Sequence, residues 1–236
     1  KAVELQVFAA NSLEKALPEV QKLYTDQTGT AFSDTQFKAS GDLVEQMRAG
    51  ATVDVLITAS KGTMDDAEAA ELVDAGTRED MFVNDLVIIR AEGSDTKIEA
   101  IADVANLAGK TVPAGKYANQ ALASVGLYTG TEGDDGEYAP ELADKVALAD
   151  KVGTAASYVS TGDCVAGFVY SSDIFRYGGI EEAFVCPEDS HKPIVYPGAV
   201  AESSEHADEA KAFIDFCLTN KKAQKIWAKY GFELSE

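Results

Sequence analysis

The 236 residues predict an α/β protein made of parallel strand–helix–strand units. Short apolar runs alternate with stretches in which apolar residues recur every three or four positions, the spacing of amphipathic helices. Strands that alternate with helices pair in parallel and form an open, doubly wound sheet. Hydrophobic residues make up 46% and charged residues 25% of the chain, so it can bury a sizeable core as a soluble globule.

The first half of the chain predicts three strand–helix units. Strands are expected at 3–9, near Phe32 and at 53–58, and the apolar positions that follow them predict helices over 13–27, 43–47 and 64–72. The first helix should stop near Gly29. Pro18 is expected well inside this helix, where the missing N–H would kink it.

The second half repeats the pattern and adds two closing helices. Strands are expected at 86–89, 165–170 and 194–200, with a helix at 119–125 and an exposed loop at 129–137, which is rich in Gly, Asp and Glu. The closing helices hold the apolar residues of 212–217 and 226–230. The sequence shows neither an internal repeat nor a low-complexity tract.

Charge and cysteine usage exclude several classes of protein. A net charge of −20 argues against binding to nucleic acid or to anionic membranes. No apolar run approaches the roughly 20 residues of a membrane helix, and no signal peptide opens this sequence. The three cysteines lack metal or redox spacing; Cys217 is expected in the core, whereas Cys164 and Cys186 either pair or stay free.

Two serines stand where an open α/β sheet binds its ligands, beyond the carboxyl ends of strands. Ser12 follows the first predicted strand, Ser40 follows the second, and each precedes a helix. A helix start presents unpaired N–H groups and the positive end of the helix dipole, so two such starts with hydroxyl groups could hold a small anion. Taken singly, each serine is more simply explained as an N-cap.

An enzyme is the competing hypothesis. Ser12 and Lys15 match the S-x-x-K motif of serine acyl enzymes, with the serine at a helix start. The partner motifs S-D-N and K-T-G are absent, and neither of the two histidines lies in a metal or triad pattern. The sequence therefore favours a binding protein over an enzyme.

A series of motifs resembles those of periplasmic molybdate-binding proteins, and they occur in one order along nearly the whole chain. Residues 8–16 (FAANSLEKA) resemble the family's opening FAAASL motif, and residues 37–43 (FKASGDL) its second serine loop. The further segments that are similar to family motifs are 51–59, 113–118 (PAGKYA), 167–173 (GFVYSSD), 184–191, 196–200 (YPGAV) and 230–232.

The resemblance implies a two-lobed type II periplasmic-binding-protein fold, each lobe a doubly wound mixed sheet flanked by helices. The expected lobes are residues 1–84 with 198–236, and residues 85–197, with the ligand in the cleft between them. The implied function is that of the extracytoplasmic solute-binding subunit of an ABC transporter. It would capture molybdate or tungstate and act as a monomer with a membrane permease and its ATPase, without a cofactor or a protein-bound metal.

The resemblance also implies a ligand set of neutral hydrogen-bond donors. Ser12 and Ser40 would each offer a hydroxyl and an N–H, Ala114 and Val152 an N–H, and Tyr170 its phenol. Val152 is placed from residues 149–153 (ADKVG), which are similar to a helix-opening motif of the family. The implied location is the periplasm or the outer face of the membrane, with or without a lipid anchor.

Three departures from the family pattern accompany these matches. Asn11 replaces a small residue, the stretch 109–112 before Pro113 is shorter than the family's strand and turn, and residues 129–142 look expanded. Sulfate and phosphate remain alternative ligands on the same fold. Hydrogen phosphate would need an acceptor in the site; Asp42 and Asp150 are the nearby carboxylates, and both are expected to be solvated or to cap helices.

Overall fold

The computed structural model describes residues 2–236, and the chain forms two compact units. Unit 1 comprises Lys1–Val83 and Ile194–Glu236, and unit 2 comprises Asn84–Pro193. The sequence prediction placed the two boundaries after residues 84 and 197. Each unit is an α/β structure with its own sheet and its own helices, which confirms the predicted fold class.

Unit 1 is built on a six-stranded mixed sheet in the order β12-β6-β11-β5-β2-β4. β2 is parallel to both β4 and β5, whereas β5 is antiparallel to β11. A short parallel pair, β1 with β3, lies outside this sheet. The strands of the unit are β1 (Glu4–Leu5), β2 (Val7–Ala10), β3 (Ala31–Phe32), β4 (Gln36–Lys38), β5 (Val55–Ile57), β6 (Glu79–Asn84), β11 (Ile194–Val200) and β12 (Phe232–Leu234).

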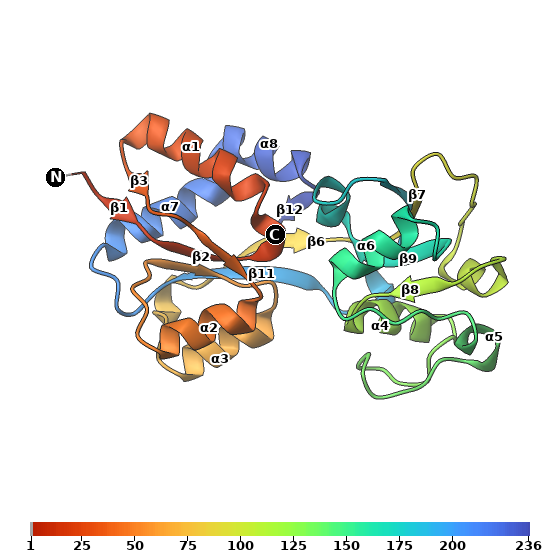
Figure 1. The fold of residues 1–236 in the computed structure, drawn as a ribbon. Helices are drawn as coiled ribbons and strands as arrows, with labels where there is room; N and C mark the ends of the chain where they lie inside the picture. Colours follow the sequence, from red (N-terminus) through yellow and green to blue (C-terminus); the bar gives the residue numbers. More distant parts are fainter. Residues whose placement is uncertain (1) are drawn as a thin grey trace. The chain divides into compact units, whose positions relative to one another are not determined.

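Helices cover both faces of the unit 1 sheet, as Figure 1 shows. α2 and α3 lie on one face, where Leu43, Met47 and Met64 pack with Phe8 and Leu56 of the sheet. α1, α7 and α8 pack together on the other face. The helices are α1 (Ala16–Thr28), α2 (Ser40–Arg48), α3 (Lys61–Ala69), α7 (Ala207–Thr219) and α8 (Lys221–Lys229).

Unit 2 has a four-stranded mixed sheet in the order β10-β7-β9-β8. β8 and β9 are parallel, and β7 is antiparallel to both β9 and β10. Ala155 and Val159 of α6 pack on this sheet against Val87, Val112 and Val169. The elements are β7 (Leu86–Ala91), β8 (Thr111–Pro113), β9 (Ala166–Tyr170), β10 (Ile180–Val185), α4 (Lys116–Ser124), α5 (Pro140–Ala143) and α6 (Val152–Ser160).

Two helix predictions were wrong in detail. The chain forms a separate 3₁₀ turn at Asn11–Leu13 before α1 starts at Ala16, so Pro18 lies in the first turn of α1. There its missing N–H would have had no helical partner, and no kink is required. α3 ends at Ala69, and Leu72 lies beyond it. The strands β6, β8, β10 and β12 were not predicted. Gly29 ends α1 in a left-handed conformation, as expected.

The three cysteines are buried free thiols, so Cys164 and Cys186 do not form a disulfide. Burial raises the pKa of the Cys186 thiol to about 12 and also raises the pKa of Cys217, which keeps both thiols protonated at neutral pH. Their role is therefore to pack in the core, as expected for Cys217. Over residues 2–236, the helices are too short or too polar to cross a membrane.

Candidate functional site

Ser12 lies in the 3₁₀ turn that follows β2, and its hydroxyl is held by a tyrosine. The N-cap of this turn is Ala10, so Ser12 is not a cap. Ser12 is 9% exposed, and its Oγ lies 2.7 Å from the Oη of Tyr196, a residue of β11 that is 1% exposed. Either hydroxyl can donate in this pair. The turn therefore presents a buried hydroxyl whose position is defined by another strand.

Ser40 is the first residue of α2 and also does not cap its helix. Ala39 occupies the N-cap position, with no side-chain cap hydrogen bond. The Oγ of Ser40 instead accepts the N–H of Ala59, at 2.9 Å. Because an amide N–H can only donate, this contact leaves the Ser40 proton available for an outside acceptor. The interpretation of both serines as simple helix caps is wrong.

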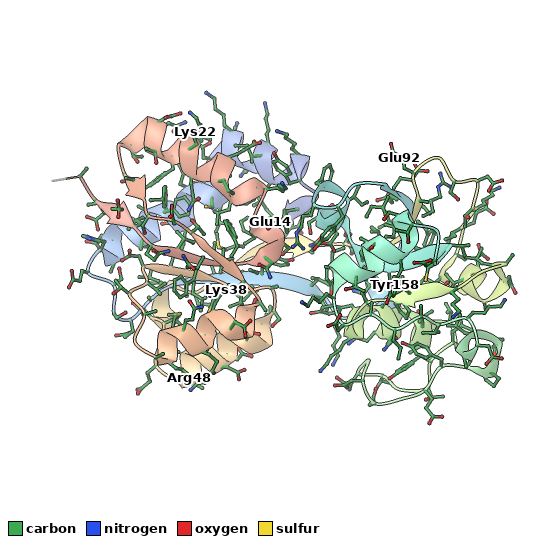
Figure 2. The ribbon with its side chains drawn as sticks, viewed as in Figure 1. Glu14, Lys22, Lys38, Arg48, Glu92 and Tyr158 are labelled. Carbon is green, nitrogen blue, oxygen red and sulfur yellow. The ribbon has the colours of Figure 1, made fainter. Side chains whose placement is uncertain are left out.

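Strand register brings these groups to one edge of the unit 1 sheet. In the parallel pair β2–β4, Ala10 is opposite Lys38, so Ser12 and Ser40 each lie two residues beyond a matched position. Ala59 likewise lies two residues beyond Ile57, the last residue of β5. Lys38 ends β4 and is labelled in Figure 2. The predicted convergence of the two serine loops thus follows from parallel pairing at adjacent strands.

In unit 2, Ala114 follows β8 but its N–H is used within the sheet. This N–H donates to the carbonyl of Phe168 on β9 at 3.4 Å, a long hydrogen bond that continues the ladder between the two strands. β8 is present as a three-residue strand despite the shortened sequence before Pro113. The structure does not favour the Ala114 amide as a free donor. The candidate donors are the N–H groups that open α4, directly after Gly115.

Tyr170 ends β9 and is anchored by the turn that follows. Its backbone N–H donates to Oδ2 of Asp173 at 2.9 Å, and the fully buried Asp173 forms an ion pair with Arg176 at 3.0 Å. The Tyr170 phenol oxygen lies 3.8 Å from where a side chain on Gly115 would begin. The predicted Tyr170 hydroxyl therefore stands beside the start of α4.

Val152 is the first residue of α6, as the resemblance implied, and the helix start is free of a side-chain cap. Val152 and Tyr177 both pack against the hydrophobic core cluster that contains Ala114. A side chain on Gly153 would begin 3.0 Å from the Tyr177 phenol oxygen, so glycine allows this tyrosine to approach the first turn of α6. The sequence did not predict this approach of Tyr177 to α6, because nothing in the local sequence links the two.

The candidate donors are electrically neutral, and two lysines near them in the sequence form ion pairs. Lys116 pairs with Asp134 at 2.9 Å and Lys61 with Asp80 at 3.1 Å. The hydrogen bond and charge of Asp134 raise the pKa of Lys116. Asp42, near Ser40, is exposed. Within residues 2–236, no cluster of three or more His, Cys, Asp or Glu side chains could hold a metal ion.

The serine acyl enzyme hypothesis receives no support from this geometry. The Ser12 hydroxyl is hydrogen-bonded to Tyr196, whereas Lys15 is an exposed residue directly before α1. A lysine that activates a serine must lie in hydrogen-bond reach and lose charge by burial. The Nδ1 of His191 lies 2.8 Å from the backbone carbonyl of Lys192.

Two α/β units with neutral donors at the carboxyl ends of their strands define a class, the solute-binding proteins. The chain belongs to the bacterial extracellular solute-binding protein family, whose model matches residues 5–233. It is 31% identical over 243 residues to the molybdate-binding protein of Escherichia coli, covering 98% of this chain and 89% of that protein. The molybdate-binding protein of Haemophilus influenzae is 29% identical, with 98% and 90% covered. These relatives confirm the resemblance found in the sequence motifs.

Solved structures show the same fold. A substrate-binding domain from Clostridium difficile, assigned to a molybdenum ABC transporter, superposes with a TM-score of 0.83 at 28% identity and covers 100% of both chains. The periplasmic molybdate-binding protein of Azotobacter vinelandii has a TM-score of 0.75 at 19% identity, covering 98% of this chain and 100% of that one. A sulfate-binding protein from Mycobacterium tuberculosis has a TM-score of 0.76 at 20% identity, with 99% and 88% covered. The fold alone therefore does not select the anion.

Proposed function

We propose that this chain is the extracytoplasmic binding subunit of an ABC importer and that it captures molybdate or tungstate. The observation that carries the proposal is the pair of serine hydroxyls at matched ends of β2 and β4, with the Ser40 proton left to donate. The relatives named as molybdate-binding proteins support the same ligand. A membrane permease and its ATPase are the partners that this role requires.

The proposed ligand groups are neutral donors, found in each unit near the ends of its strands. Ser12 and Ser40 supply hydroxyl groups, Tyr170 supplies its phenol, and the first N–H groups of α4 and α6 complete the set. Each helix start adds the positive end of its dipole. Hydrogen bonds to a charged acceptor each contribute about 1.5–3 kcal/mol, so several neutral donors suffice without a cation.

The chemistry of these groups selects among oxyanions. Molybdate, tungstate and sulfate are acceptor-only dianions, whereas hydrogen phosphate carries a proton that needs an acceptor. Asp42 and Asp150, each two residues from a proposed donor in the sequence, are both exposed. A donor-only site therefore disfavours hydrogen phosphate. Sulfate remains the second candidate, because the sulfate-binding protein shares the fold.

A ligand panel tests the proposal directly. The unfolding temperature and isothermal titration calorimetry are measured with molybdate, tungstate, sulfate, phosphate and a β-lactam. A ligand at a hundred times its dissociation constant stabilises the folded protein by about 2.7 kcal/mol, so binding is readily detected. Molybdate and tungstate should bind most tightly, with one ion per chain. Preferential binding of sulfate or phosphate, or stabilisation by the β-lactam alone, would reject the proposal.

A further inference from the structure

The hydroxyl groups of Ser12 and Ser40 differ in the partner that each one has. Ser40 accepts from the Ala59 N–H, a group that cannot accept in return. Ser12 is paired with the Tyr196 phenol, and in this pair either oxygen can be the donor. The direction of the hydrogen bond is thus set by the backbone at Ser40 but depends on the surroundings at Ser12.

A bound dianion resolves the direction at Ser12. Because the ligand has only acceptor oxygens, the single Ser12 proton must point at the ligand, and the Tyr196 phenol must then donate to Ser12 Oγ. The result is a chain of two hydrogen bonds in one direction, from Tyr196 to Ser12 to the oxyanion. Such chains polarise their members and strengthen each bond.

The surroundings of Tyr196 hold its phenol in place before any ligand arrives. Tyr196 is 1% exposed, and its ring packs edge-on against Phe232 of β12, with 5.5 Å between ring centroids. Ser12 is also buried, in the 3₁₀ turn after β2. A rigid partner lowers the entropy lost when the Ser12 hydroxyl is oriented.

We propose that Tyr196 is a positioning residue for oxyanion binding, which orients the Ser12 hydroxyl as a donor through its phenol. This inference rests on the proposed function, because it requires an acceptor-only ligand at Ser12. Tyr196 would act on the ligand through Ser12 and not by direct contact, and this dependence can be measured.

A double-mutant cycle measures the dependence. Tyr196→Phe should weaken molybdate binding about three- to tenfold, the effect of losing one hydrogen bond. In a Ser12→Ala background the same substitution should have little further effect, because the group it orients is gone. Tyr24→Phe is the matched control: Tyr24 is also a buried tyrosine of unit 1, but its ring packs against Phe213 and Phe216. This control should leave the dissociation constant unchanged.

The outcomes separate the two proposals. If the wild-type chain does not bind molybdate, the proposed function fails. If the wild type binds but Tyr196→Phe has the same affinity, or loses as much affinity in the Ser12→Ala background, only the role of Tyr196 fails. Should Tyr196→Phe not fold, the wild type labelled with ¹³C at the tyrosine ζ-carbons gives the answer. The Tyr196 signal should shift when molybdate is added and the Tyr24 signal should not; an unchanged Tyr196 signal overturns the inference.

Discussion

Serine at a strand-to-helix junction has two distinct uses in this protein. Ser60 is a true N-cap of α3, since its Oγ accepts the N–H of Thr63 at 3.2 Å. Ser40 stands one position later in its helix and accepts an N–H from a different loop. A shift of one residue thus distinguishes a serine that stabilises its own helix from a serine whose hydroxyl proton is not used by this contact.

This difference predicts distinct effects of two matched substitutions on affinity. Ser40→Ala should weaken oxyanion binding by about 1–3 kcal/mol, because it removes a donor to a buried charge. It should also lower stability by about 1 kcal/mol, because the Ala59 N–H loses its acceptor. Ser60→Ala should lower the stability of the free protein by about 1 kcal/mol and leave affinity unchanged, because it removes a helix cap. Calorimetry and urea unfolding measure both quantities. An unchanged dissociation constant for Ser40→Ala would remove Ser40 from the site; Tyr170→Phe should behave like Ser40→Ala.

At the scale of an element, the start of α4 depends on an unusual backbone conformation. Gly115 caps this helix with φ 86° and ψ −179°, a region that is essentially restricted to glycine. The preceding residue, Ala114, still belongs to the sheet through its bond to Phe168. Gly115 therefore turns the chain from β8 into α4 within one residue, beside the Tyr170 phenol.

Gly115→Ala should consequently damage both the fold and the site. The strained backbone should cost about 1–3 kcal/mol of stability, and a displaced α4 start should reduce oxyanion affinity. Gly62→Ala is the control, because Gly62 lies in α3 with open space around it and without a positive φ. It should be neutral or stabilising by up to about 1 kcal/mol. Thermal unfolding and calorimetry decide; equal stabilities of the two variants would show that the turn tolerates a side chain.

At the scale of the whole molecule, the ligand and the protein carry charge of the same sign. The net charge is −20, yet the proposed ligand is a dianion. Lys61 and Lys116 could have offset this charge near the proposed donors, but each is paired with an aspartate. Lys151 precedes α6 and is exposed, and Lys38 ends β4. The long-range field is therefore expected to repel the ligand, whereas the short-range donors bind it.

The association rate of molybdate should then increase when salt is added. At about 0.15 M salt the screening length is about 8 Å, which removes most of the long-range repulsion. The dissociation rate should change little, since it is governed by short-range hydrogen bonds. Stopped-flow measurements at low and moderate ionic strength test this expectation. An association rate that falls with salt would instead show that Lys38 and Lys151 attract the ligand locally.

Local spacing in the sequence determined the alternation of strands and helices and the position of both serine loops. Period and turn residues are properties of neighbouring positions, so β2, β5 and β11 could be predicted without knowing their partners. The ordered motifs likewise identified Ser12, Ser40 and Tyr170 as candidates. No strand was predicted at β6, β8, β10 or β12.

Only the tertiary structure decided what each candidate group does with its hydrogen-bonding capacity. Ser12 and Tyr196 are 184 positions apart, and Ser40 and Ala59 are 19 apart. The Ala114 N–H, a predicted ligand group, is used by Phe168 because β8 and β9 pair in parallel. These partners depend on which strands become neighbours and in which register. That choice follows from burying the whole core, and local sequence patterns do not contain it.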